Sequence, residues 1–231
     1  MTMHEIIKSA LNVKRVILTI TESKKIFDSY GIPINKSIFV KSEADLHQNI
    51  EKLNLPVVMK IVSPQITHKT DVGGVILNLQ TMSEIENAYQ VMTKRISNLQ
   101  PKPTIHGVLI EEYVKNGLEL ILGTFNDPVF GPTIMLGLGG IFVEILKEVT
   151  FGLIPINEQE AYDIIDNIKS SFIIKGFRGI NPVNRDLLVS IMLSLSKIVE
   201  ENPIKEIDIN PLIAIDNKLI TVDARIILKN N

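Results

Sequence analysis

The sequence contains no cysteine, and only 5% of its 231 residues are aromatic. Without cysteine the chain can form neither a disulfide framework nor a thiolate metal site. No apolar run approaches the roughly 18 residues that a membrane-spanning helix needs, and the residues after Met1 show no signal-peptide pattern. From these absences we expect a soluble, cytoplasmic protein.

The sequence also lacks an excess of charge of either sign. Charged residues make up 22% of the chain and nearly cancel, with a formal net charge of -2. No global field therefore recruits nucleic acid or an anionic membrane, and partners must be inferred from individual sites. The 45% of hydrophobic residues, with few aromatics among them, predict an aliphatic core large enough for one domain or two small ones.

Apolar, β-branched runs alternate with amphipathic stretches along the chain, which is typical of a sheet with helices packed on it. The clearest local signal is the capping box formed by Thr19 and Glu22, which opens a helix that Gly31 ends. Helices are predicted at 3–11, 19–30, 42–53, 83–96, 158–169 and 184–200, and strands at 38–40, 57–61, 75–79, 133–136, 149–156, 206–212 and 219–227. The fold class is therefore α/β, in the wide sense that includes α+β.

Two prolines close together, Pro101 and Pro103, interrupt regular structure and indicate a boundary between subdomains. We place the two subdomains at about 22–100 and 101–231. Directly after this boundary, residues 108–114 and 118–125 are predicted to pair as an antiparallel hairpin around a turn at 115–117.

A strand and loop between residues 57 and 74 carry the groups best suited to phosphate chemistry. Lys60 lies on an apolar strand with no acidic residue near it in the sequence, and the loop that follows offers His68, Lys69 and a diglycine, Gly73-Gly74. An ammonium, an imidazole and glycine amides turned toward a ligand favour phosphate binding, with the histidine as a candidate phosphoryl acceptor. Two plainer interpretations stay open: a lysine that reaches solvent, and a histidine satisfied within its loop.

The last strands place oxygen ligands together. Asp208 and Asn210 are two residues apart, so they lie on the same face of one strand, and Asp223 belongs to the next strand. Carboxylate and amide oxygens suit Mg²⁺, which proteins hold through one or two carboxylates together with phosphates and water. The alternative is that Asp208 and Asn210 cap a turn before Pro211.

A second acidic stretch could bind a nucleoside. If residues 111–114 form an edge strand, the main chain around Glu111, Tyr113 and Val114 can pair with an adenine edge, and Glu119 can accept hydrogen bonds from ribose hydroxyls. A solvated acidic hairpin is the alternative. The glycines at 137, 139 and 140 match neither the dinucleotide fingerprint nor the Walker A pattern, so they add little alone.

Together, these motifs resemble a known family. They are Val57 to Pro64, His68 to Val75, Asp127 to Pro132 followed by Gly137 to Glu144, and Asp208 to Leu212 followed by Val222 to Arg225. In this order they closely resemble the β subunit of ADP-forming acetyl-CoA synthetase (acetate–CoA ligase), an ATP-grasp protein related to the succinyl-CoA synthetase β subunit. The resemblance covers almost the whole chain, from the N-terminal helices onward.

The resemblance implies an ATP-grasp fold of two subdomains with the nucleotide site between them, within a single domain over 1–231. It implies an acid–thiol ligase that converts acetyl-CoA, ADP and phosphate to acetate, CoA and ATP, reversibly. ATP or ADP and Mg²⁺ would bind this chain, whose partner would be a CoA-binding α subunit in an α2β2 heterotetramer, with no nucleic acid and no membrane.

The resemblance also implies residue roles. Lys60 would contact nucleotide phosphates, while Asn210 and Asp223 would hold the metal with Asp208 in support. The adenine and ribose would lie at Glu111, Tyr113, Val114 and Glu119. His68 would be the histidine that accepts phosphate from the α subunit and delivers it to ADP, with Lys69 and Arg225 as further cations.

Two alternatives remain at this stage. The chain could be the ATP-grasp subunit of a ligase for another acid, such as succinate or a branched-chain or aryl acid, because acyl specificity would lie mostly in the α subunit. It could also be a non-catalytic regulatory subunit that binds nucleotide, although such a subunit would need no equivalent of His68.

Overall fold

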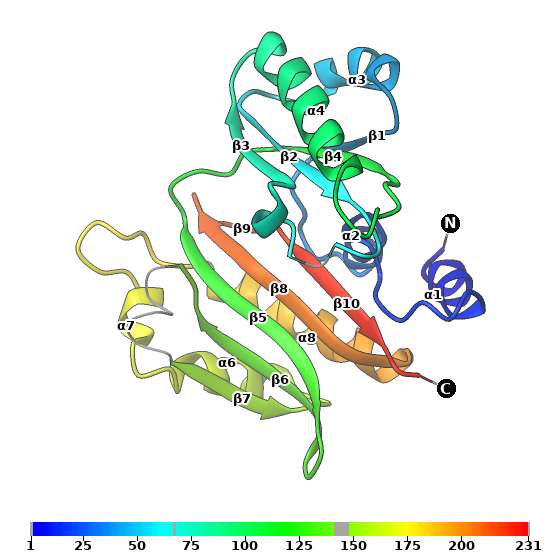
Figure 1. Ribbon diagram of the computed structural model, residues 1–231. Coiled ribbons are helices and arrows are strands. Elements are labelled where there is room, and N and C mark those ends of the chain that lie inside the picture. Colours follow the sequence, from blue (N-terminus) through cyan, green and yellow to red (C-terminus); the bar gives the residue numbers. More distant parts are fainter. Residues whose placement is uncertain (1, 67, 141–147, 231) are drawn as a thin grey trace. The chain divides into compact units, whose positions relative to one another are not determined.

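A computed structural model describes residues 2–66, 68–140 and 148–230 of the chain (Figure 1). Its internal contacts divide the chain into two compact units. The large unit comprises Met1–Ile34 and Asn116–Asn231, and the small unit comprises Asn35–Lys115. The candidate residues for phosphate, nucleoside and metal binding are distributed over both units.

The small unit is built on a four-stranded antiparallel sheet in the order β1-β4-β2-β3. Its strands are β1 (Ser37–Val40), β2 (Val57–Val62), β3 (Val75–Leu79) and β4 (Gly107–Glu112). Helices α3 (Glu43–Asn49) and α4 (Met82–Ser97) pack on the sheet, and short 3-10 helices cover Ile50–Lys52 and Thr70–Val72. All six residues of β2 are buried, so Lys60 enters the unit through its most apolar strand.

The large unit contains a six-stranded sheet in which β10-β8-β5-β6-β7 are neighbours and β9 also pairs with β8. The strands are β5 (Leu118–Asp127), β6 (Gly131–Leu138), β7 (Val149–Leu153), β8 (Ile204–Ile215), β9 (Lys218–Thr221) and β10 (Ala224–Leu228). The helices are α1 (Met3–Asn12), α2 (Ile20–Ser29), α6 (Glu158–Asp166), α7 (Ser171–Ile174) and α8 (Arg185–Glu201). Helices α6 and α8 pack on each other and on the sheet, while α2 packs on β10 (Figure 1).

Strand β8 shows how this sheet separates core from site. Ile207 and Ile209 are buried in the aliphatic core beneath α8, whereas Asp208 and Asn210, which alternate with them, lie on the other face. Side chains alternate between faces because the strand repeats every two residues. The prediction that Asp208 and Asn210 share a face is thereby confirmed.

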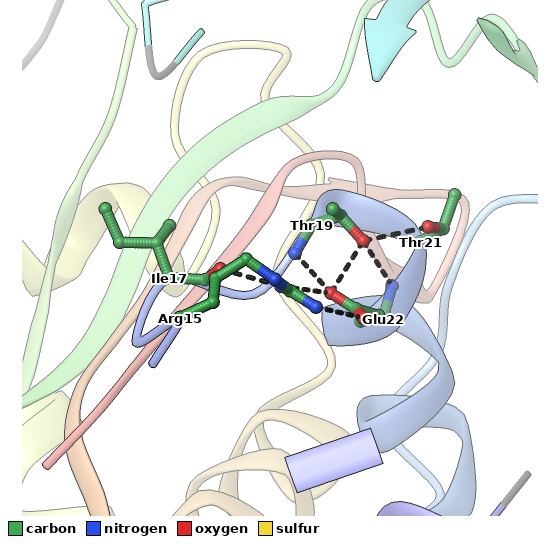
Figure 2. Close-up of polar contacts among 5 residues, drawn as sticks. All are labelled: Arg15, Ile17, Thr19, Thr21 and Glu22. Carbon is green, nitrogen blue, oxygen red and sulfur yellow. Dashed lines mark hydrogen bonds and ion pairs between the residues drawn. The ribbon is translucent and has the colours of Figure 1, made fainter. Parts of the chain in front are cut away.

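The start of α2 is fastened by a polar cluster around Glu22 (Figure 2). Thr19 and Glu22 form the predicted capping box, with Thr19 N donating to Glu22 Oε2 over 2.7 Å and Glu22 N donating to Thr19 Oγ1 over 3.3 Å. Arg15 adds a two-pronged contact to the same carboxylate at 2.8 and 2.7 Å, and also donates to the carbonyl of Ile17. Since Leu18 N donates to Ile226 O, the cluster joins α2 to the edge of the sheet.

We expect Glu22→Gln to destabilise the protein by about 1–3 kcal/mol at pH 7, because it removes charge-assisted bonds to Arg15 and weakens a helix cap. Burial alone would raise the pKa of Glu22, but the bonds from Arg15 and Thr19 outweigh it, and the pKa falls below its ordinary 4.5. A lowered carboxyl pKa stabilises the fold above the ordinary value, and this contribution disappears as the pH falls through the folded-state pKa. The stability lost in the Glu22→Gln variant should therefore be largest at neutral pH and should shrink below about pH 4.5.

Urea denaturation of wild type and variant at pH 7 and pH 3 measures this difference. The matched control is Glu5→Gln, because Glu5 completes a capping box with Thr2 at the start of α1, and that box has no two-pronged arginine contact among the described residues. Equal losses for the two variants would show that Arg15 contributes nothing to stability.

Several long-range features differ from the sequence-based expectation. Strands β4 and β5 belong to different sheets, so the predicted hairpin around 115–117 is wrong. Strand β4 pairs with β1 and β2 instead, which places the division between the units after Lys115 rather than at Pro101 and Pro103. The chain turns at Asn116, whose φ is 61°, as it passes from the small unit into β5.

Three smaller differences concern local boundaries. Helix α4 is capped by Thr81 rather than by Ser83, and the short helix α7 was not expected. The predicted strand over 219–227 is divided by Val222 and Asp223 into β9 and β10. Every pairing between two of the strands named above is antiparallel, which makes the fold α+β. No helix in the same ranges has the length and apolar character that a bilayer span requires.

Candidate functional site

Lys60 is paired with an acidic residue that is distant in the sequence. Its Nζ lies 2.7 Å from Glu111 Oε2, and the two side chains are 6% and 0% exposed. On the paired strands Val58 lies opposite Glu111 and Lys60 opposite Leu109, so the two charged residues are diagonal neighbours on one face of the sheet. The sequence showed a lysine without an anion nearby, and β4 provides one.

The segment predicted to bind adenine, residues 111–114, does not form an edge strand. Strand β4 is flanked by β1 and β2, so the hypothesis of an edge strand at 111–114 is wrong. The strand ends at Glu112, however, and Tyr113 N donates to Pro56 O over 2.9 Å. Val114 follows half-buried, and within the described residues its N–H donates to no protein acceptor. An adenine edge could be met by the main chain here, directly beyond the strand.

The loop after β2 closes on itself. Gly74 N donates to Lys69 O over 2.7 Å, Gly73 N donates to Thr70 O over 3.0 Å, and Gly73 has a left-handed φ of 69°. The expectation that this diglycine turns its amides toward a ligand is therefore wrong, because both amides close the turn. His68 is exposed directly before that turn, and Thr67 lies outside the described residues.

On the large unit, the oxygen ligands predicted from the sequence come from neighbouring strands. Pairing of Ala224 with Ile209 and of Thr221 with Leu212 continues through Val222 N, which donates to Pro211 O over 3.2 Å. This register brings Asp223 level with Asn210 across the sheet. Asp223 also accepts a hydrogen bond from Ala224 N at 3.0 Å, which orients its carboxylate.

Asp208, two residues before Asn210, lies beside a basic residue. Arg225 Nη2 is 3.7 Å from Asp208 Oδ2 and 2.6 Å from Glu206 Oε1. Burial raises the pKa of Asp208, and the nearby Arg225 opposes that rise without cancelling it. A cation at this place would favour the ionised carboxylate.

The side-chain oxygens of Asp208, Asn210 and Asp223 are suitable ligands for a hard divalent cation. Among the described residues, no three histidine, cysteine or acidic side chains gather into one cluster. Mg²⁺ needs no such cluster, because one or two protein carboxylates suffice when phosphates and waters complete its shell. Asp208, Asn210 and Asp223 offer carboxylate and amide oxygens of this kind from one side of the sheet.

Glu119, the predicted ribose ligand, lies against the glycine-rich segment after β6. Gly139 N donates to Glu119 O over 2.7 Å. A Cβ added at Gly139 would lie 3.2 Å from the Glu119 main chain, and one at Gly140 would lie 3.2 Å from Glu119 Oε2. The sequence pattern had assigned these glycines no role, yet they leave room for this glutamate. Residues 141–144 of the same motif lie outside the described residues.

The candidate residues thus form two groups. The small unit contains Lys60, His68, Glu111, Tyr113 and Val114, and the large unit contains Glu119, Asp208, Asn210 and Asp223. The first group contains the basic residues and the main chain beyond β4, and the second group contains the carboxylate and amide oxygens of β5, β8 and the residue before β10. Each unit contains an antiparallel sheet, and the family model described as "ATP-grasp domain" matches residues 9–228, so the chain is an ATP-grasp protein.

Comparison with known proteins identifies the family within the ATP-grasp proteins to which the chain belongs. Over 225 residues the chain is 42% identical to "Acetate--CoA ligase [ADP-forming] I subunit beta" of Pyrococcus furiosus, with 97% of each chain covered. The chain therefore belongs to the family of β subunits of ADP-forming acetate–CoA ligases, within the ATP-grasp proteins.

Larger relatives and solved structures agree with this family. The chain is 43% identical over 204 residues to "4-hydroxybutyrate--CoA ligase [ADP-forming]" of Nitrosopumilus maritimus, which matches 88% of this chain but only 29% of that longer relative. Its fold matches dinucleotide forming acetyl-coenzyme A synthetase 1 of Ca. Korarchaeum cryptofilum, solved with coenzyme A and Ca-AMPCP, with a TM-score of 0.93, 39% identity and coverage of 99% and 100%. Another structure of that synthetase contains Mg-AMPPCP, and its phosphohistidine segment points towards the nucleotide binding site, with a TM-score of 0.85, 38% identity and coverage of 99% and 100%.

Proposed function

We propose that this chain is the nucleotide-binding β subunit of an ADP-forming acetate–CoA ligase. With a CoA-binding α subunit it would convert acetyl-CoA, ADP and phosphate to acetate, CoA and ATP, reversibly. The observation that carries the proposal is an exposed His68 next to a closed turn, directly after the strand that holds the buried Lys60. A protein that only senses nucleotide needs the lysine but has no need of the histidine.

In the proposed reaction His68 carries the phosphoryl group between the subunits. A bond forms from an imidazole nitrogen of His68 to phosphorus as the bond to the phosphorylated α subunit breaks. An oxygen of the ADP β-phosphate then attacks that phosphorus, the P–N bond breaks, and ATP leaves with the imidazole restored. Phosphoryl transfer of this kind depends mainly on alignment and on neutralising charge.

The remaining candidates bind and orient the nucleotide. Lys60 would contact phosphate oxygens, while Tyr113 and Val114 at the end of β4 would bind the adenine edge and Glu119 the ribose. Glu111 would act through Lys60, because the ion pair fixes the direction of the lysine side chain.

Asp208, Asn210 and Asp223 would hold Mg²⁺, in keeping with relatives solved with metal–nucleotide complexes. The bound ion would neutralise phosphate charge during transfer. We further propose an α2β2 assembly. The need for a further polypeptide is supported by 4-hydroxybutyrate–CoA ligase, because this chain covers only 29% of the length of that relative.

The proposal is tested by co-expressing the chain with its α subunit and measuring ADP phosphorylation with a panel of acyl-CoA thioesters. We expect phosphate-dependent ATP formation with acetyl-CoA, and none with either subunit alone. Faster turnover with another thioester would instead identify a ligase for a different acid, a possibility favoured by the similarity to 4-hydroxybutyrate–CoA ligase. Nucleotide binding without phosphorylation under every condition would indicate a regulatory subunit.

We expect Asp223→Asn to raise the Mg²⁺ concentration for half-maximal activity by about 10-fold or more, because it removes one of few charged ligands. The asparagine oxygen can still accept the bond from Ala224 N, so the local fold should survive. The matched control is Asp216→Asn, which removes an exposed carboxylate from the nearby turn between β8 and β9. An unchanged Mg²⁺ requirement in the Asp223 variant would remove this residue from the metal site.

A further inference from the structure

The guanidinium of Arg95 lies against the turn that follows His68. Arg95 belongs to the last turn of α4, and a Cβ added at Gly73 would lie 2.1 Å from its Nη1 and 3.2 Å from its Cζ. Real atoms do not approach so closely, so the guanidinium occupies the space that any other side chain at position 73 would need. The left-handed φ of 69° at Gly73 also favours glycine, so both constraints keep position 73 free of a side chain that would displace Arg95.

This turn adjoins the reactive histidine. The bond of 2.7 Å from Gly74 N to Lys69 O closes it, and Lys69 is the residue after His68. Asp71 is a charged residue within the turn, and Lys94 precedes Arg95 in the sequence of α4. The Arg95 guanidinium therefore approaches the loop from a helix that is packed on the sheet of the small unit, whereas the neighbouring Lys69 belongs to the loop itself.

Arg95 also differs from three other arginines of the described chain. Arg15, Arg185 and Arg225 each lie within 2.6–2.7 Å of a carboxylate oxygen. Arg95 is exposed, and in the described ranges its guanidinium forms no ion pair or hydrogen bond. A basic residue in the last turn of a helix is favoured by the helix dipole, but Lys94 already supplies that interaction.

We propose that Arg95 binds phosphoryl oxygens while the phosphoryl group is attached to His68. A phosphorylated histidine presents anionic oxygens, and the planar guanidinium can donate two parallel hydrogen bonds to such a group. Arg95 would thus hold the carried group against the turn, and it would exchange neither a proton nor an electron with it. The inference rests on the proposed function, since it assigns a ligand to the phosphoryl group that His68 is proposed to carry.

The test uses the complex with its α subunit and ³²P-labelled phosphate. Label on His68 is measured after acetyl-CoA is added without ADP, and its transfer to ADP is then followed by rapid quench. We expect Arg95→Gln to slow the transfer by about 10- to 100-fold, the range for losing one charge-assisted contact to a reacting group. The KM for ADP should change by less than about 2-fold, because Arg95 is not proposed to bind the nucleotide.

Two further variants separate charge from packing. Arg95→Lys keeps the charge but not the planar contact with Gly73, so partial recovery of the rate is expected. Lys94→Gln removes the neighbouring exposed charge and should leave the rate unchanged. Thermal unfolding of each variant shows whether the small unit remains folded.

Three outcomes would overturn the assignment: wild-type transfer in Arg95→Gln, equal slowing in Lys94→Gln, or no recovery in Arg95→Lys with a lowered Tm. The first two would show that Arg95 makes no specific contact, and the third would show that it only packs the turn. Failure of the proposed function has a separate signature. In that case the wild-type His68 would remain unlabelled, whether or not the complex formed ATP.

Discussion

Replacing His68 with alanine is expected to lower ADP phosphorylation by about 10³-fold or more, since removal of a group that carries the transferred phosphoryl blocks the pathway. Binding of Mg²⁺ and ADP should change little, because His68 lies on the exposed loop and not in the buried Lys60–Glu111 pair. The other described histidines, His4, His47 and His106, are also exposed, but none follows the lysine strand. They offer no evident substitute.

The assay compares overall turnover, label on the β chain and ADP affinity by calorimetry in the complex with the α subunit. His47→Ala is the matched control, because His47 is an exposed histidine of the same unit whose Nδ1 lies 3.6 Å from Glu86. That variant should keep wild-type activity. Full turnover in His68→Ala would mean that phosphate passes from the α subunit to ADP without this relay.

The features that the sequence predicts well are local. Thr19 and Glu22 lie three residues apart, so the capping box that they form can be recognised from the local sequence alone. The alternation along β8 is equally local, and it correctly placed Asp208 and Asn210 on one face. Such features follow from helix and strand periodicity alone.

The features that the sequence could not predict depend on long-range pairing. Residues 115–117 have the composition of a hairpin turn, and nothing local shows that the strands on either side enter different sheets. Glu111 neutralises Lys60 from a strand much further along the chain, so the lysine had no visible partner. Separation in sequence also concealed why Gly139 and Gly140 are glycines, since Glu119 comes from another strand.

The diglycine after His68 shows a different limit. Glycines near a lysine suggest amides turned toward an anion, but Gly73 and Gly74 use both amides to close the turn. What the glycines provide is a left-handed bend and space for the Arg95 guanidinium, which comes from α4. The diglycine is therefore compatible with phosphate chemistry nearby, but its role is to shape the turn and not to present amides to an anion.

Replacing Lys60 with methionine is expected to destabilise the protein by about 3–5 kcal/mol, which is typical when one partner of a buried ion pair is removed. The methionine side chain would fill much of the same volume, but the Glu111 carboxylate, 0% exposed, would lose the ammonium at 2.7 Å. The matched control is Lys197→Met. Lys197 lies 3.8 Å from Glu201 with both side chains largely exposed, so its loss should cost less than about 1 kcal/mol.

A double variant separates the structural role of the pair from nucleotide binding. Lys60→Met combined with Glu111→Leu leaves no buried charge at this place, and we expect urea denaturation to show most of the lost stability restored. Calorimetry should nevertheless find that Mg-ADP binding is still strongly weakened. Stability requires only that no unpaired charge is buried, whereas binding of the nucleotide phosphates requires the Lys60 ammonium. Wild-type affinity in a folded double variant would contradict the role of Lys60 as a phosphate ligand. If the double variant were as unstable as Lys60→Met alone, the instability would arise from packing and not from the uncompensated carboxylate.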